Sequence, residues 1–271
     1  MFTSRMEQDY EEALSGTIFS PLQGGALLRF ATIDSTNTYL VNAAQSDASA
    51  GTVCVADEQT AGRGRGGNTW RSEPGSGLYL SALLRPALEV ADTLKISLAA
   101  GLAVQRALLQ VARLHVDLRW PNDIVVPQRM GPSKKLGGIL TETAVTVEGR
   151  LRYAVVGMGV NLNRSEMPPE LSAISTSVFL ETGHGVDRDA LMIAVLHHLA
   201  EQMMALEADP HETIRRFEQK SVWARCLRVK VAEDEGYTGV TDGLDDRGLL
   251  RIKLADGTIR MPRHGGVREA D

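Results

Sequence analysis

The pattern of apolar segments changes once along this chain, near Trp223. Before that point, apolar β-branched runs such as residues 52–59 alternate with long stretches of helical period such as residues 93–112. After it, only short strand-like runs remain, and turn residues separate them at regular spacing. The sequence therefore predicts an α+β fold. A mixed β-sheet with helices is expected over residues 28–222, and a small SH3-like β-barrel over residues 223–271.

Composition limits the functions that are open to the chain. Its formal net charge of −5 argues against a broad contact with nucleic acid or a membrane surface, because both normally need a basic excess. No apolar run approaches the ~18 residues of a membrane span, and the charged N-terminus does not fit a signal peptide. Cys54 and Cys226 fit buried thiols in a reducing compartment. We therefore expect a cytoplasmic protein that binds neither DNA nor a membrane.

The N-terminal residues 1–27 are predicted to be a short extension with one acidic helix around Glu7 to Leu14. They are too short for a helix-turn-helix domain. Further along, residues 116–126 and 135–146 are predicted to be strands, and two helices are expected at about 187–207 and 210–219.

The stretch "GRGRGG" at residues 62–67 follows the predicted strand 52–59 directly. Consecutive glycines let backbone amides converge on an anion, and arginines supply paired donors to phosphate or carboxylate. The stretch matches neither a Walker loop nor a dinucleotide fingerprint. Its spacing alone predicts an anion-binding loop, with a flexible surface loop as the alternative.

Other stretches place polar residues at the ends of predicted strands. "RWPND" (119–123) ends in an asparagine and an aspartate, where Asp123 could order a cation or simply form a turn. "KKLGGILTE" (134–142) puts lysines before a strand whose glycines permit close approach of a flat ligand, although a solvated lysine pair is the alternative. "GMGVNLN" (157–163) again ends in small residues and asparagine.

Taken together, "DSTN", "EQTAGRGRGG", "WPND", "KKLGGIL" and "GMGVNLN" occur in an order that resembles the biotin protein ligases, over roughly Leu28 to Asp271. The resemblance implies a catalytic domain like that of class II aminoacyl-tRNA synthetases and biotin ligases, with a C-terminal SH3-like barrel. It also implies a two-step reaction. Biotin and ATP, with Mg²⁺, give biotinyl-5′-AMP and pyrophosphate, and a lysine of the biotin carboxyl carrier protein of acetyl-CoA carboxylase then takes the biotin.

The resemblance assigns roles residue by residue. It implies catalytic roles for Lys135, Arg63, Arg65 and Asp123, where Asp123 positions Lys135 or the metal. It implies contacts of the nucleotide with Trp70, Asn122 and Asn161, and no certain protein metal ligand, since Mg²⁺ would arrive with ATP. The residues implied to bind biotin or biotinyl-AMP are Ser35, Thr36, Asn37, Gln59, Arg63, Gly64, Arg65, Lys135 and Gly138.

The chain departs from the family pattern at two positions. Arg119 replaces the usual lysine of KWPND, and Gly66 stands where some relatives carry a third arginine. We also expect the 62–67 stretch to be disordered without ligand and to order over the intermediate, where it excludes water.

Other functions remain open at this stage. A lipoate or octanoate ligase or transferase of the same superfamily is the first alternative. A transcriptional repressor is the second, although residues 1–27 favour a monofunctional enzyme without a DNA-binding domain. The third is a non-catalytic nucleotide-binding protein. The resemblance also implies a homodimer.

Overall fold

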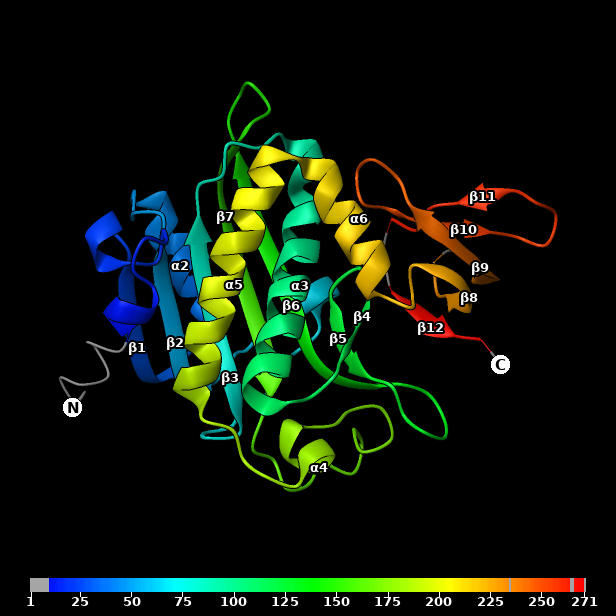
Figure 1. Cartoon of the computed structure of the whole chain (residues 1–271), viewed down its shortest axis with the longest axis horizontal. Coiled ribbons are helices and arrows are strands. Elements are labelled where there is room, and N and C mark those ends of the chain that lie inside the picture. The colour runs from blue at the N-terminus through cyan, green and yellow to red at the C-terminus, as the bar shows by residue number, and fades with distance from the viewer. Residues whose placement is uncertain (1–9, 234, 264–265, 271) are drawn as a thin grey trace.

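The computed structural model describes residues 10–233, 235–263 and 266–270. A seven-stranded sheet carries helices on both of its faces, and a second, smaller sheet comes after it in the chain (Figure 1). The strands and α-helices are β1 (Ala26–Ile33), α2 (Thr36–Gln45), β2 (Thr52–Gln59), β3 (Gly77–Leu84), α3 (Thr93–Ala112), β4 (Asp117–Arg119), β5 (Asp123–Val126), β6 (Lys134–Val145), β7 (Leu151–Asn161), α4 (Val178–Thr182), α5 (Arg188–Ala208), α6 (Pro210–Lys220), β8 (Arg225–Val231), β9 (Tyr237–Leu244), β10 (Leu250–Lys253), β11 (Ile259–Arg260) and β12 (Val267–Glu269).

The large sheet has the strand order β1-β2-β3-β7-β6-β5-β4. Its first pair, β1 with β2, is parallel, and the remaining neighbours are antiparallel, so the predicted mixed sheet is confirmed. Helices α3 and α5 cover one face, and α2 lies on the other (Figure 1). Because side chains alternate along a strand, β2 contributes buried side chains to both faces of the sheet. Val53 and Val55 join the core under α3 and α5, while Cys54 joins a second cluster with Leu40 of α2.

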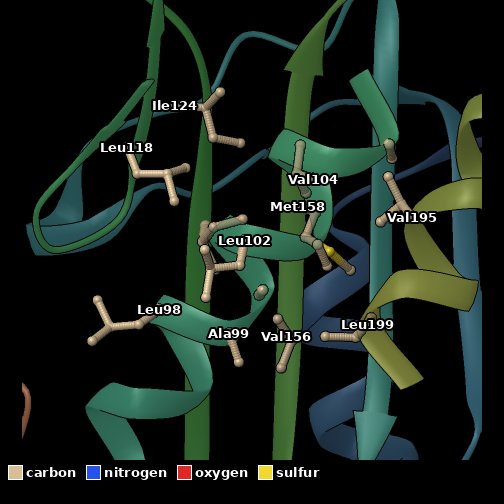
Figure 2. Close-up of a cluster of buried hydrophobic side chains, with 14 of the residues drawn as sticks. Leu98, Ala99, Leu102, Val104, Leu118, Ile124, Val156, Met158, Val195 and Leu199 are labelled. Atoms are coloured by element: carbon tan, nitrogen blue, oxygen red, sulfur yellow. The ribbon is translucent and has the colours of Figure 1, made fainter. Parts of the chain in front are cut away.

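The main core lies between the sheet and the two long helices. Figure 2 shows Ala99 of α3 next to Val156 of β7, with Leu199 of α5 close by, while Leu98 of α3 points away from them. Burying one such side chain contributes about 1.5–3 kcal/mol. The segment Val90–Ala112 is long and apolar enough to cross a membrane by length and composition alone, but it is the central helix of this core.

From residue 10 onward, where the structure describes it, the N-terminal segment packs into the fold. Tyr10, Leu14 and Phe19 are buried within the main core, and the Tyr10 hydroxyl donates a hydrogen bond of 3.3 Å to the carbonyl of Phe19. The acidic helix predicted around Glu7 to Leu14 lies partly outside the described residues.

The single strand predicted over residues 116–126 is wrong. It is a hairpin in which β4 pairs antiparallel with β5 through Asp117 opposite Val125. Pro121 lies in the connecting turn, since proline has no amide hydrogen and cannot continue a central strand. The turn brings the "WPND" residues to the end of the sheet.

The C-terminal strands form a five-stranded antiparallel sheet in the order β11-β10-β9-β8-β12. The small all-β part predicted after Trp223 is therefore observed as an antiparallel sheet, and in its described residues no pairing joins the edge strands β11 and β12 to close a barrel. These edge strands are too short to give many ladder hydrogen bonds. Cys226 of β8 is exposed, contrary to the expectation of a buried thiol.

This small sheet packs tightly on the β4–β5 hairpin. The indole Nε1 of Trp120 donates a buried hydrogen bond of 2.9 Å to the carbonyl of Gly248. Arg119 lies over the ring of Trp223, with 5.4 Å between the guanidinium carbon and the ring centroid. The C-terminal sheet therefore supports the turn that carries Asp123.

Candidate active site

The glycine- and arginine-rich segment forms a small hairpin, called here the 62–70 loop. Its ends are joined by a hydrogen bond of 2.9 Å from the amide of Trp70 to the carbonyl of Gly62, and its middle by one of 2.7 Å from Gly64 to Asn68. The structure thus gives a folded conformation of the loop. The expected ordering upon ligand binding stays a prediction.

The backbone conformation at the tip of the loop requires glycine. Gly66 and Gly67 have φ angles of 68° and 79°, in the left-handed region that side chains rarely adopt. Gly62 is needed for a different reason, since a Cβ atom there would lie 2.4 Å from the carbonyl oxygen of Trp70. At position 66, where some relatives carry arginine, the observed turn favours glycine.

A narrow pocket of about 50 Å³ lies under the 62–70 loop, between the start of α2 and the strands β6 and β7. Most of the residues predicted to hold the substrate meet here, although they come from segments far apart in sequence. Those that line the pocket are Ser35, Thr36, Asn37, Gln59, Arg63, Gly64, Arg65, Trp70, Asn122, Lys135 and Gly138.

Hydrogen bonds fix the polar side of this pocket. Ser35 is the N-cap of α2, and its hydroxyl accepts from the amide of Thr38. The amide and hydroxyl of Thr36 donate to Oε1 of Gln59 over 2.9 and 3.1 Å, and Nε2 of Gln59 donates to Ser72 over 2.8 Å. The Gln59 amide is therefore held in one orientation.

Asn37 is held from three directions. Its Nδ2 donates to the carbonyl of Leu140 and to Oε2 of Glu142, over 3.2 and 2.9 Å, and its Oδ1 accepts from the hydroxyl of Ser81 over 2.6 Å. A Cβ atom at Gly157 would lie 2.2 Å from that Oδ1, so glycine makes room for it. Because Nδ2 is already used, only Oδ1 of Asn37 has spare capacity for a ligand.

An ion cluster stands at the floor of the site. The ammonium of Lys135 lies 2.5 Å from Oδ1 of Asp123, and the guanidinium of Arg119 donates to Oδ2 over 2.7 and 3.2 Å. Burial raises the pKa of Asp123, but the charges of Lys135 and Arg119 outweigh burial and hold that pKa below its ordinary value. The Asp123 carboxylate is therefore ionised and holds both cations in place.

Glycine and tryptophan shape the surroundings of the lysine. A Cβ atom at Gly138 would lie 3.3 Å from both Cε and Nζ of Lys135, closer than nearly all real contacts. The Lys135 ammonium lies 5.6 Å from the ring centroid of Trp70. The indole in turn rests on Gly159, where a Cβ atom would come within 2.6 Å of the ring.

A larger cleft of about 730 Å³ adjoins the pocket, and Asp123 and Asn161 line it. Nδ2 of Asn161 donates to the carbonyl of Thr176 over 3.0 Å. The residues shared by the pocket and the cleft are Gly64, Arg65, Trp70, Asn122 and Lys135. Lys135 and Arg65 thus stand at the junction of the two cavities.

Backbone contacts also hold Lys135. Its amide donates to the carbonyl of Ile174 over 2.8 Å, and its carbonyl accepts from Thr176 over 2.9 Å. The segment around Ser175 therefore pairs with the start of β6 in a parallel bridge. Its Ile174 and neighbouring apolar side chains form a wall of the cleft.

Sequence reasoning missed several polar residues of the site. Arg268 of β12 lines the cleft and lies 3.9 Å from Oδ2 of Asp123, and Arg71 pairs with Glu170 across the cleft mouth at 2.8 Å. Glu142 pairs with Arg63 of the loop. No local signal marks Arg268. Glu142 falls inside the quoted "KKLGGILTE", where an acid on a site strand was a usable clue.

The sequence is similar to a known protein family and to several characterised proteins. A model of the "Biotin/lipoate A/B protein ligase family" matches residues 29–161. A biotin–[acetyl-CoA-carboxylase] ligase of Paracoccus denitrificans is 30% identical over 246 residues, which cover 84% of this chain and 95% of that protein. The bifunctional ligase/repressor BirA of Bacillus subtilis is 30% identical over 243 residues, which cover 89% of this chain and 73% of that protein.

The fold is similar to solved structures of the same kind. The biotin protein ligase of Aquifex aeolicus, in complex with biotin and ATP, matches with a TM-score of 0.73 and 31% identity. The match covers 89% of this chain and 97% of that one. The predicted fold class of the large domain is therefore confirmed.

Proposed function

The chain belongs to the biotin protein ligase family, and on that premise we propose that it is an ATP-dependent biotin protein ligase. The acceptor is a lysine of the biotin carboxyl carrier protein of acetyl-CoA carboxylase, the enzyme named for its Paracoccus relative. Lipoate and octanoate transfer belong to the same broad family, but the relatives and structures described above are biotin ligases.

The reaction joins two anions and then separates them. A carboxylate oxygen of biotin attacks the α-phosphorus of ATP, the bond to the β-phosphate oxygen breaks, and pyrophosphate leaves. The lysine amine of the carrier then attacks the acyl carbon of biotinyl-AMP. The bond from that carbon to the AMP oxygen breaks, AMP leaves, an amide forms and the amine loses a proton.

The observation that carries this proposal is the position of Lys135 and Arg65 at the junction of the pocket and the cleft. A carboxylate in the pocket and a phosphate in the cleft would meet there, and both would face these cations. Fixed positive charge at the place where negative charge crowds together lowers the barrier to adenylation. We assign Arg63, in the loop above the pocket, to closing the site.

Asp123 and Arg119 have supporting roles in this proposal. Asp123 holds the Lys135 ammonium toward the junction, and Arg119 fixes the opposite oxygen of the same carboxylate. The guanidinium of Arg119 donates from two nitrogens to this oxygen, which a lysine could not do. The departure from the family lysine therefore keeps the charge and adds a directional contact.

We propose that the remaining residues divide between the two substrates. Ser35, Thr36, Asn37, Gln59, Gly64 and Gly138 surround biotin in the pocket, while Trp70, Asn122 and Asn161 contact the nucleotide. The buried Nε1 of Trp70 has no hydrogen-bond partner among the described residues. Because this nitrogen is buried against Gly159, the indole meets the purine with its flat face.

Mg²⁺ enters this scheme as part of the substrate MgATP. Both oxygens of Asp123 are engaged by cations, and no cluster of three or more His, Cys, Asp or Glu side chains suited to a metal occurs in the described ranges. The side chains therefore do not fit a protein-bound metal centre. Triphosphate oxygens and water are the ligands that Mg²⁺ prefers in such sites.

Three further expectations belong to the proposal. The protein acts in the cytoplasm, forms a homodimer and does not bind DNA. Sedimentation of the purified protein tests whether it is a homodimer. A gel-shift experiment with the operator of a biotin synthesis gene tests whether it binds DNA.

The test of the function is pyrophosphate release on mixing the protein with MgATP and either biotin or lipoate, without carrier. Release with biotin alone supports the proposal. Release with lipoate alone assigns the chain to the alternative reaction, and release with neither removes both.

A further inference from the structure

We infer that Glu142 of β6 is a positioning residue whose carboxylate anchors the 62–70 loop, through Arg63, to the pocket wall, through Asn37. The inference rests on the proposed function, because it concerns how the site closes over biotin and the adenylate. It goes beyond that function by naming the contact that opens and closes the pocket.

One oxygen of Glu142 joins a fixed part of the site to the loop. Oε2 accepts from Nδ2 of Asn37 over 2.9 Å, and the same oxygen pairs with Nη2 of Arg63. Glu142 itself is held inside the large sheet, where it lies opposite Val155 of β7. Asn37 is fixed further by Leu140 and Ser81.

The loop end of this anchor is Arg63, near the start of the 62–70 loop. Arg63 pairs with Thr69 across the loop, so its backbone belongs to the hairpin and not to the large sheet. Its side chain reaches past the pocket to β6. A movement of the hairpin away from β6 would therefore have to break the Arg63–Glu142 pair, while the Asn37–Glu142 bond could stay.

Exposure makes this pair reversible. The side chains of Arg63 and Glu142 are 43% and 31% exposed. Ion pairs this exposed typically change an equilibrium by no more than about fivefold. The anchor is strong enough to favour the closed loop and weak enough to release it.

The size of the pocket requires such a release. Its volume of about 50 Å³ is far below the roughly 300 Å³ at which small-molecule sites begin. A bicyclic ligand cannot enter without movement of a wall. The sheet and the N-terminus of α2 are held by many backbone hydrogen bonds, so the 62–70 loop is the wall that moves.

Glu142→Gln separates the two contacts. Glutamine removes the charge that holds Arg63 but keeps a carbonyl oxygen that can accept from Asn37. Glu142→Ala removes both contacts. Glu89→Gln is the matched control, because Glu89 forms an exposed ion pair with Arg150 at 3.7 Å, away from the site residues.

The first measurement is amide hydrogen exchange without substrates, followed by mass spectrometry of peptides that cover the 62–70 loop. We expect exchange about two- to fivefold faster in Glu142→Gln than in the parent, and no change in Glu89→Gln. Equal exchange in all three proteins would overturn the anchor, whatever reaction the enzyme catalyses.

The second measurement is the lifetime of enzyme-bound biotinyl-AMP after rapid removal of free ligands. We expect it to shorten by about two- to fivefold in Glu142→Gln and to stay the same in Glu89→Gln. The same substitution in an Arg63→Gln background should have no further effect, since the partner is already absent. A full effect of Glu142→Gln without Arg63 would overturn the inference.

The two measurements separate the inference from the proposed function. Faster exchange with no pyrophosphate release by the parent would support the anchor and remove the ligase assignment. Normal pyrophosphate release with unchanged exchange and unchanged lifetime would keep the ligase and remove the anchor.

Discussion

At the scale of single residues, the site depends on two glycines whose missing side chains leave room for their neighbours. Gly138 leaves the space into which the ammonium of Lys135 extends, and Gly159 leaves the space for the indole of Trp70. A methyl group at either position would move a side chain that the proposed reaction needs. Glycine here is a requirement of packing against the site, since neither residue has a positive φ.

Gly138→Ala should lower the rate of pyrophosphate release by up to about 10-fold, because the new methyl group displaces the end of Lys135 by a few tenths of an ångström, and ~1 Å at a reacting centre can cost about 100-fold. Single-turnover kinetics with saturating biotin and MgATP measures this. Gly101→Ala in α3 is the control, since its Cβ would make only an ordinary contact of 3.5 Å with Leu118. A loss of the same size in Gly101→Ala would show that the effect is general destabilisation.

Asp123→Asn should lower the free energy of unfolding at pH 7 by about 3–5 kcal/mol, because it leaves the buried guanidinium of Arg119 without its partner. The folded pKa of Asp123 lies below the unfolded value, so the stabilising contribution is present above about pH 4. It is lost as the pH falls through the folded pKa. Urea unfolding at several pH values should therefore show a constant difference from pH 7 to 5 that shrinks only below about pH 4.

At the scale of elements, the β4–β5 hairpin links the two sheets. The indole of Trp120, which lies in the turn of the hairpin, donates to the carbonyl of Gly248 in the C-terminal part. The hydroxyl of Ser221, which follows α6, donates to the carbonyl of Leu118 over 2.5 Å. The element that carries Asp123 is thus supported from outside the large sheet. The C-terminal sheet therefore contributes to the site by holding this hairpin in place.

Trp120→Phe should reduce the free energy of unfolding by about 1–3 kcal/mol, since it leaves the buried carbonyl of Gly248 without its donor. The ring and its packing are largely kept. Denaturant unfolding measures the change, and Trp223→Phe, which removes an indole from the same region, serves for comparison. A change within error of zero would mean that water replaces the lost donor.

Several elements follow from local sequence, and others do not. The helices α5 and α6 begin where Asp187 and Asp209 cap them, and the first half of β2 is apolar and buried, so the predictions there are confirmed. The hairpin at 117–126 was missed because its two strands have only three and four residues, too few to show separate strand patterns. The open C-terminal sheet depends on pairing between distant strands, which local composition does not encode.

The residues of the site also divide into those that the sequence predicts and those that it does not. The residues carried over from the family resemblance line the pocket and the cleft, because motif positions retain their place in the fold. Ser81, Glu142 and Arg268 were not predicted. Ser81 and Glu142 act through Asn37 and Arg63, and Arg268 arrives from the second sheet, so only the tertiary arrangement reveals them.

At the scale of the whole molecule, one continuous core joins both sheets. Trp223, Val229, Leu250 and Ile252 of the C-terminal part belong to the same buried cluster as the residues between the large sheet and α3. The C-terminal part contains about 50 residues, which is marginal for independent stability. The two parts should therefore not unfold separately.

We expect a single cooperative unfolding transition in urea. Hydrogen exchange by peptides of β3 and of β10 should report the same free energy of global opening, since both strands lie in the shared core. Two transitions, with β10 exchanging through a clearly weaker opening, would show that the C-terminal sheet is an independent unit.

The shared wall of the pocket and the cleft has an energetic consequence. Gly64, Arg65, Trp70, Asn122 and Lys135 face both cavities, so whatever orders or displaces them on one side alters the other. Occupancy of the two cavities is then thermodynamically linked, and linkage is reciprocal. The factor by which biotin changes the dissociation constant of a nucleotide must equal the factor by which that nucleotide changes the dissociation constant of biotin, so that each substrate is an effector of the other.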